Sequence, residues 1–355
     1  MGRAVRLESG ASDQGPKSPS LGPSPSLPQH AGSPGPPLVT IAIPVLNEAR
    51  LLPGLLDCLR AQTWPREAMQ IIIADGGSSD GSDDIAREAA REFPDFVVIP
   101  NPGRIAAAGL NRALARARGA YFLRLDARAR PAADYVERCV AHLQTGQWAG
   151  VGGAQIAVGD QESGRAIALA LNHPLGAGGP RYRRAGASVE SETLFLGAYP
   201  IDWLKRAGGW DETFAANEDY ELNTRLRQAG GRLLVASDVR VTYIARDSLP
   251  ALARQYARYG SWRFDTWRRH PQAMRPRHLA PTAWTAGLAL GAALTPLTPW
   301  LLLAMTLPYL LAITLAAASL AAGRGWRLFP RIWLAFPAMH LSWGAGFWRR
   351  ALTGR

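Results

Sequence analysis

The chain has 355 residues, a formal net charge of +12 and a pI near 10.4. This length accommodates one large domain with an appendage, and two cysteines, Cys58 and Cys139, exclude a disulfide framework and fit a reducing compartment. A basic balance is typical of proteins that meet nucleic acid, anionic membranes or phosphorylated substrates. No zinc-finger spacing or aromatic-basic RNA motif is present in the sequence, so we expect no nucleic-acid partner.

The first 37 residues form a segment of distinct composition. They are rich in Pro, Ser and Gly, and they contain no apolar central run of the kind that a signal peptide needs. We therefore predict a disordered tail over residues 1–37. Since no cleavable signal is visible, we expect the catalytic part of the chain to stay in the cytoplasm.

Strand and helix patterns alternate after the tail. Short β-branched or apolar runs predict strands, and apolar residues at helical spacing predict the helices between them. The predicted strands are 38–44, 71–74, 96–99, 121–125, 149–158, 192–200, 233–236 and 239–244. The predicted helices are 49–62, 82–92, 106–117 and 217–228, and a Gly-rich loop is predicted over 159–189. This alternation predicts an α/β domain over residues 38–265 with a mostly parallel central sheet.

The composition changes in the last third of the chain. Residues 279–322 contain no Asp, Glu, Lys, Arg or His, and this run is twice the length of about 20 residues that one membrane-spanning helix needs. Two crossings fit, with a turn near Pro296 and Pro299, and the arginines on both flanks favour a hairpin whose two ends lie in the cytoplasm. The alternative is a buried helical hairpin of a soluble domain.

A third apolar stretch, residues 329–347, ends at two arginines. We interpret it as interfacial or re-entrant, with a third span as the alternative. Residues 266–355 are therefore predicted to be a membrane-associated region of two or three apolar helices. The expected location is the inner (cytoplasmic) membrane, multi-pass, with the catalytic domain in the cytoplasm.

Carboxylates follow two of the predicted parallel strands. Asp75 and Asp126 each come directly after such a strand, and ligands of open α/β sheets bind at that edge. Asp75 either closes its own turn or accepts a hydrogen bond from the imide of a pyrimidine base. Asn47 and Glu48 follow the first strand in the corresponding position, where they could bound the same nucleoside pocket.

Asp126 is a candidate metal ligand. A divalent cation held by a carboxylate and phosphate oxygens would neutralise the diphosphate of a sugar nucleotide. Arg128 occupies the position of the second acid that usually completes such a pair, and it is either a solvated loop residue or a phosphate clamp. Gln255, Arg258 and Tyr259 share one side of a predicted helix. They either close over the diphosphate or lie at the membrane interface.

Glu218 and Asp219 are adjacent carboxylates at the start of the predicted helix 217–228. A helix N-terminus favours the ionised form of a carboxylate, which suits a base that takes a proton from a sugar hydroxyl. We predict Asp219 as this base, with Glu218 beside it as a residue that positions the acceptor or the loop. The alternative is that both side chains only complement the helix dipole.

In order along residues 38–262, these motifs resemble the family 2 inverting glycosyltransferases with the GT-A fold. The resemblance rests on Pro44-Val45-Leu46-Asn47-Glu48, Asp75-Gly76-Gly77-Ser78-Ser79-Asp80-Gly81-Ser82, Leu125-Asp126-Ala127, Gly208-Gly209-Trp210-Asp211-Glu212 and Asn217-Glu218-Asp219. The apolar C-terminal segments and the Asp-Ala-basic form of the metal motif are most similar to the succinoglycan biosynthesis glucosyltransferase branch.

The resemblance implies a nucleotide-diphosphate sugar donor, usually a UDP-sugar, an Mg²⁺ or Mn²⁺ ion, and inversion in one step. It places Asp75 on the base, Asp126 on the metal or donor sugar, and Asp219 on the acceptor hydroxyl. Tyr259 replaces the tryptophan of the family's Gln-x-x-Arg-Trp motif, and this partial match favours single additions over processive synthesis. The predicted donor-site residues are Pro44, Asn47, Glu48, Asp75, Ser78, Asp126, Arg128, Gln255 and Arg258.

The sequence therefore predicts a membrane-anchored inverting glycosyltransferase. It would move a sugar from a nucleotide donor to a lipid-linked saccharide in extracellular polysaccharide or glycan synthesis. Two alternatives stay open: transfer straight to polyprenyl phosphate, and a catalytically degenerate membrane adaptor, which Arg128 suggests. The oligomeric state is not predicted.

Overall fold

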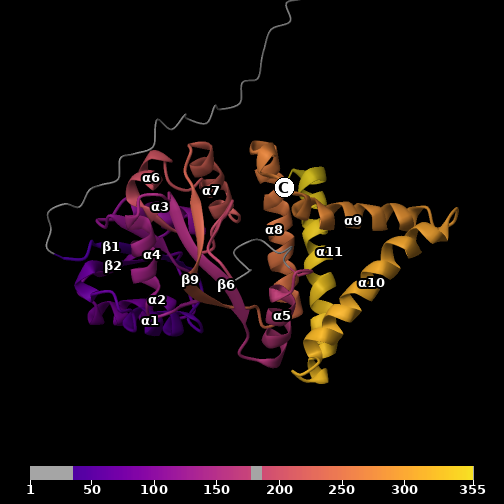
Figure 1. The fold of residues 1–355 in the computed structure, drawn as a ribbon, viewed down its shortest axis with the longest axis horizontal. Helices are drawn as coiled ribbons and strands as arrows, with labels where there is room; N and C mark the ends of the chain where they lie inside the picture. The colour runs from indigo at the N-terminus through magenta and orange to yellow at the C-terminus, as the bar shows by residue number, and fades with distance from the viewer. Residues whose placement is uncertain (1–34, 177–185, 355) are drawn as a thin grey trace, which may run out of the picture.

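The computed structural model describes residues 35–176 and 186–354. An α/β part and a group of long C-terminal helices lie side by side in it (Figure 1). Residues 1–34 of the predicted tail and 177–185 of the predicted loop lie outside the described residues.

A mixed sheet forms the centre of the α/β part. Its strands follow the order β3-β2-β1-β4-β8-β6-β9-β5, and β7 pairs with β9. The first four neighbours are parallel, whereas β8 is antiparallel to both β4 and β6. The predicted α/β class is confirmed, with parallel pairing among β3, β2, β1 and β4 and again between β6 and β9. The strand bounds are β1 (Val39–Val45), β2 (Met69–Asp75), β3 (Phe96–Pro100), β4 (Tyr121–Arg124), β5 (Ala129–Pro131), β6 (Gly150–Val158), β7 (Val189–Glu190), β8 (Ala198–Pro200) and β9 (Leu233–Ile244).

Helices cover both faces of the sheet (Figure 1). Successive residues of a strand point to opposite faces, so Ile71 and Ile73 pack on the α1 side while Ile72 packs on the α3 side. Each buried side chain of this size contributes about 1.5–3 kcal/mol. The helix bounds are α1 (Leu52–Arg60), α2 (Ser82–Ala89), α3 (Ala106–Leu114), α4 (Tyr135–Gln144), α5 (Glu162–Asn172), α6 (Ile201–Arg206), α7 (Glu218–Gln228), α8 (Leu249–Arg269), α9 (Pro276–Ala293), α10 (Pro299–Ala321) and α11 (Phe329–Thr353).

The predicted loop 159–189 is wrong over the residues of α5. This helix buries Ile167 and Leu171 at helical spacing against the C-terminal helices, and the glycines around it hide that pattern in the sequence. The predicted strand 192–200 is short, because only β8 pairs there and Leu196 has a left-handed backbone (φ 50°). The two late predicted strands form one strand, β9, whose register with β6 shifts at one point.

The C-terminal helices form two groups. Helices α8 and α11 run side by side. Helix α9 leads away from them to a turn, and α10 returns from that turn, so the pair projects away from the α/β part (Figure 1). Within the described residues, α10 is the one helix that is long and apolar enough to cross a membrane. The apolar part of α9 is shorter than the about 20 residues that a span needs, because the helix begins with Arg277 and His278 and ends at Ala293. The third apolar stretch belongs to α11, which buries Phe336 and Met339.

Two glycines allow α8 and α11 to approach at backbone distance. A Cβ atom on Gly260 would lie 2.0 Å from the carbonyl oxygen of Trp343, and one on Gly346 would lie 2.0 Å from that of Ala257. No side chain fits in either position, so the two helices pack with their backbones in contact.

We predict that Gly260→Ala separates α8 from α11 and destabilises the chain by about 1–3 kcal/mol, the usual range for overpacking. Thermal unfolding of the full chain in detergent measures this as a lower Tm. Gly287→Ala in α9 is the control, since its nearest atom would be the Met305 sulfur at 3.4 Å. Equal Tm values for the two variants would contradict the prediction.

Candidate active site

A cavity of about 1050 Å³ lies between the carboxyl ends of the parallel strands and helices α7 to α11. It brings together most of the residues that the sequence singled out for chemistry. The predicted site residues that line it are Pro44, Asn47, Glu48, Asp126, Arg128, Glu218, Asp219, Gln255 and Arg258. Asp75 and Ser78 do not line the cavity. They lie at the end of β2 and in the loop after it, and this loop contacts Asn47.

Asp75 has the first of the two roles considered for it, because it closes its own turn, and one of its oxygens is left over. Its Oδ2 atom accepts hydrogen bonds from the backbone N–H groups of Gly77 (2.8 Å) and Ser78 (3.0 Å), which closes the turn after β2. Its Oδ1 atom is buried and has no hydrogen-bond partner among the described residues. A buried acceptor without a partner is costly in free energy, so this oxygen is suited to a ligand N–H.

Asn47 joins the loops that follow β1 and β2. Its backbone N–H donates to Ser78 Oγ (2.9 Å), and its own Oδ1 accepts from the N–H of Ser79 (2.9 Å). Asn47 has a left-handed backbone (φ 55°), a conformation that asparagine tolerates better than most residues. The hydroxyl of Ser78 is thus engaged in holding the loop, and the two loops form one rigid edge of the cavity.

Two carboxylates and two guanidinium groups share the next part of the cavity. Burial raises the pKa of Glu48, and the charges of Arg128 and Arg246 act in the opposite direction. Asp126 accepts a hydrogen bond at Oδ1 from the backbone N–H of Arg128 (2.9 Å), and Arg128 Nη1 donates to the carbonyl of Ile244 (3.3 Å). Arg246, which the sequence reasoning missed, lines the cavity directly after β9.

The candidate metal ligand Asp126 is not part of a cluster of ligating side chains among the described residues. Residues 35–176 and 186–354 contain no group of three or more His, Cys, Asp or Glu side chains that could hold a metal ion. Hard divalent cations bind six or more oxygens, often including substrate phosphates and water. The site therefore fits a cation only if a bound diphosphate supplies most of its ligands.

Asp219 and Glu218 share one buried arginine. Arg124 at the end of β4 forms ion pairs from Nη2 with Glu218 Oε1 (3.0 Å) and from Nη1 with Asp219 Oδ2. The other oxygen of Asp219 accepts from the indole Nε1–H of Trp210 (3.1 Å). The sequence reasoning read Arg124 only as a strand residue. Its signal was a charge inside a run of apolar residues, since a buried charge needs a partner.

Helix α8 closes one wall of the cavity. Gln255 Nε2 donates to the hydroxyls of Tyr243 (3.1 Å) and Tyr259 (2.9 Å), which confirms that Gln255 and Tyr259 share a side of the helix. Asn217, with a left-handed backbone at the start of α7, donates from Nδ2 to the carbonyl of Tyr259 (3.2 Å). Arg258 is exposed yet reaches the cavity lining.

The far end of the cavity is aromatic and belongs to the C-terminal helices. Trp284 and Tyr309 stack there with ring centroids 4.1 Å apart, and the Tyr309 hydroxyl lies 3.0 Å from His340 Nδ1. These residues fall in stretches that the sequence reasoning treated only as membrane segments. The cavity therefore runs continuously from the acidic loops to the helices that project from the body.

The fold and this site define a family. The chain matches the models of glycosyl transferase family 2 over residues 40–201 and of glycosyl transferase family group 2 over residues 121–321. It is 36% identical over 318 residues to the succinoglycan biosynthesis protein ExoA of Rhizobium meliloti (strain 1021), with 89% of this chain and 95% of that protein covered. The chain belongs to glycosyltransferase family 2, and it is a glycosyltransferase.

Further similarities support the same placement. The chain is 26% identical over 231 residues to the dolichyl N-acetyl-alpha-D-glucosaminyl phosphate 3-beta-D-2,3-diacetamido-2,3-dideoxy-beta-D-glucuronosyltransferase of Methanococcus voltae, covering 63% of this chain and 72% of that protein. Among solved structures, it resembles the mannosyltransferase PcManGT of Pyrobaculum calidifontis in complex with GDP-Man and Mn²⁺ (TM-score 0.57, 22% identity, 90% and 88% covered). It also resembles S. aureus TarS 1–349 (TM-score 0.51, 14% identity, 90% and 92% covered). These two likenesses confirm the predicted GT-A fold.

We predict that Arg124→Met destabilises the chain by about 3–5 kcal/mol, because it leaves the buried Glu218 and the half-buried Asp219 without their counter-charge. Adding Glu218→Gln and Asp219→Asn to this variant should restore part of the lost stability, as measured by thermal unfolding. Arg118→Met is the control: it breaks an exposed ion pair with Asp95, and pairs of this kind contribute less than about 1 kcal/mol. No recovery in the triple variant would show that the ion pair is not the cause.

Proposed function

We propose that the chain is a membrane-anchored inverting glycosyltransferase. It transfers a sugar from a nucleotide-diphosphate sugar to the hydroxyl of a lipid-linked saccharide, in extracellular polysaccharide or glycan synthesis. The observation that carries this proposal is that one cavity contains both Asp126, on the donor side, and Asp219, at the start of α7. The names of the relatives from R. meliloti and M. voltae, one of succinoglycan biosynthesis and one with a dolichyl-linked sugar phosphate, support the choice of pathway and acceptor.

The donor is a UDP-sugar in this proposal. The unpartnered Oδ1 of Asp75 accepts the imide N–H of the base, and the edge formed by Pro44, Asn47 and Ser78 supports the nucleoside. The guanidinium groups of Arg128 and Arg246 face the diphosphate, and Glu48 keeps them in place by its charge. Gln255 and Arg258 close this part of the site from α8.

The proposed cofactor is Mg²⁺ or Mn²⁺. Asp126 is the residue that would hold it, together with oxygens of the donor diphosphate. When bound, the cation supplies positive charge that stabilises the departing nucleoside diphosphate.

The reaction is a direct displacement at the anomeric carbon. Asp219 accepts the proton of the acceptor hydroxyl, whose oxygen attacks the face opposite the leaving group. The new C–O bond forms while the bond from the anomeric carbon to the phosphate oxygen breaks, so the electron pair leaves with the nucleoside diphosphate. Arg124 places its positive charge against Asp219 before the reaction, and Glu218 shares the same guanidinium.

The membrane holds the acceptor close to the site in this proposal. Helix α10 is apolar, and large side chains such as Leu307 (58% exposed) and Leu311 (61% exposed) cover its outer surface. We propose that the region 266–355 is a multi-pass anchor in the inner membrane. It holds the catalytic domain 38–265, which follows the tail 1–37 in the chain, on the cytoplasmic side. The aromatic end of the cavity, at Trp284 and Tyr309, then faces the lipid-linked acceptor.

We expect Asp219→Asn to lower transfer at least about 100-fold while UDP binding stays as in the wild type, because the amide cannot accept the hydroxyl proton. The measurement offers a panel of nucleotide sugars to membranes that contain the full chain and scores transfer to extractable lipid. Calorimetry with UDP and Mn²⁺ serves as the binding control.

The same assay separates the two alternatives. A phosphate nucleophile needs little help from a base, so a mild effect of Asp219→Asn would favour transfer to polyprenyl phosphate. Absence of any nucleotide-sugar binding by the wild type would favour the membrane adaptor and would overturn the enzyme proposal.

We expect the full chain to stay with membranes after alkaline extraction, and the double substitution Leu307→Arg with Leu311→Arg to reduce the retained fraction. Each arginine near the centre of a spanning helix costs about 2.5–3.5 kcal/mol of insertion free energy. The matched control is Leu307→Ala with Leu311→Ala, which keeps the segment apolar. Complete release of the wild-type chain by alkali would contradict membrane anchoring.

A further inference from the structure

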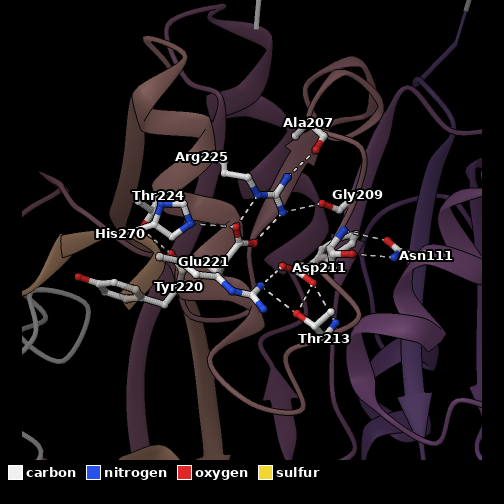
Figure 2. Close-up of polar contacts among 12 residues, drawn as sticks. Asn111, Ala207, Gly209, Asp211, Thr213, Tyr220, Glu221, Thr224, Arg225 and His270 are labelled. Carbon is white, nitrogen blue, oxygen red and sulfur yellow. Dashed lines mark hydrogen bonds and ion pairs between the residues drawn. The ribbon is translucent and has the colours of Figure 1, made fainter. Parts of the chain in front are cut away.

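Hydrogen bonds from Asn111 on α3 and Arg225 on α7 hold the loop between α6 and α7 (Figure 2). Asn111 on α3 donates from Nδ2 to the carbonyl of Trp210 (2.8 Å) and accepts at Oδ1 from its backbone N–H (2.8 Å). One side chain thus satisfies both backbone polar groups of the residue. Gly209 makes this approach possible, because its φ is +73° and a Cβ atom there would lie 2.3 Å from Asn111 Oδ1.

Arg225 on α7 holds the same loop from the other side. Its Nη1 donates to the carbonyl of Ala207 (2.5 Å) and its Nη2 to that of Gly209 (2.8 Å). Glu221 binds the guanidinium with two hydrogen bonds of 2.7 Å, and His270 Nε2 lies 3.3 Å from the same carboxylate (Figure 2). Burial acts to raise the pKa of Glu221, but the hydrogen bonds from His270 and Arg225 outweigh it and lower the pKa. The carboxylate is therefore ionised at neutral pH and locks the arginine.

The side chain of Trp210 connects this loop to Asp219. Trp210 is 2% exposed and packs against Phe122 (5.6 Å between centroids) and Tyr199 (6.4 Å). Its indole Nε1–H reaches Asp219 Oδ1 at 3.1 Å, while Arg124 binds the other oxygen. Two donors from different elements therefore fix the rotation of the carboxylate.

We propose that Trp210 is a positioning residue of the transfer reaction, and that Asn111 and the Arg225–Glu221 pair act on Asp219 through it. The inference rests on the proposed role of Asp219 as the base. A carboxylate of fixed rotation presents the same lone pair to the acceptor hydroxyl at every turnover. Misplacement of a reacting group by about 1 Å costs on the order of 100-fold in rate.

The test compares Trp210→Phe with Trp203→Phe in the full chain. Both residues are buried in the same apolar cluster, but Trp203 makes no hydrogen bond to Asp219 among the described residues. Trp210→Phe keeps the aromatic packing and removes the indole N–H. We expect kcat to fall about 10- to 100-fold, with the KM for the nucleotide sugar and the Kd for UDP unchanged. Trp203→Phe should keep the wild-type kcat, and Asn111→Ala should show an intermediate loss.

A double variant distinguishes positioning from a general loss of structure. If Trp210 acts through Asp219, adding Trp210→Phe to Asp219→Asn causes no further loss of activity, since the base that Trp210 positions is already removed. A further loss by the same factor would overturn the inference, and so would equal kcat values for Trp210→Phe and the wild type. Full activity of Asp219→Asn alone would instead overturn the proposed base, whatever Trp210→Phe shows.

Discussion

One buried guanidinium, that of Arg124, joins the two halves of the site. It lies at the end of β4, two residues before Asp126, and it pairs with Glu218 and Asp219 at the start of α7. Without it the two carboxylates, which are partly shielded from water, would repel each other. The start of α7 could then not lie against the sheet. Strand β4 therefore leads to Asp126, the proposed donor-side residue, and its last residue holds the candidate base.

The loops that surround this pair are organised on the same principle. Asn47 and Ser78 were predicted from the sequence as donor-site residues. In the structure, the side chain of each accepts a hydrogen bond from the backbone of the other's loop. The Oδ1 atom of Asp75 has no partner among the described residues, and it lies in the turn that the N–H groups of Gly77 and Ser78 close. Hydrogen bonds within the chain hold these loops in place, and the acceptor that they leave unpaired is available to a ligand.

The sequence predicted the parts of the molecule whose residues repeat a simple pattern. The N-terminal strands and the helix that follows Asn217 are local features, and the structure agrees with them. Helix α5 was missed because glycines flank a short helical pattern, and Arg246 because a single arginine after a strand carries no signal of its own. The link from Trp210 to Asp219 spans only nine residues, but it crosses an irregular loop that carries no periodic pattern, so only the folded arrangement reveals it.

The close packing of α8 on α11 also bears on how far the catalytic cavity would lie from a membrane. Gly260 and Gly346 leave no room for one helix to slide or tilt against the other, so α9 and α10 project from a firm base and not from a flexible tether. In a bilayer, such a mount would keep the catalytic cavity at a constant elevation above the lipid headgroups. This fixed distance from the membrane would then select acceptors by length, favouring those whose terminal hydroxyl lies at the level of the cavity over shorter or longer saccharides.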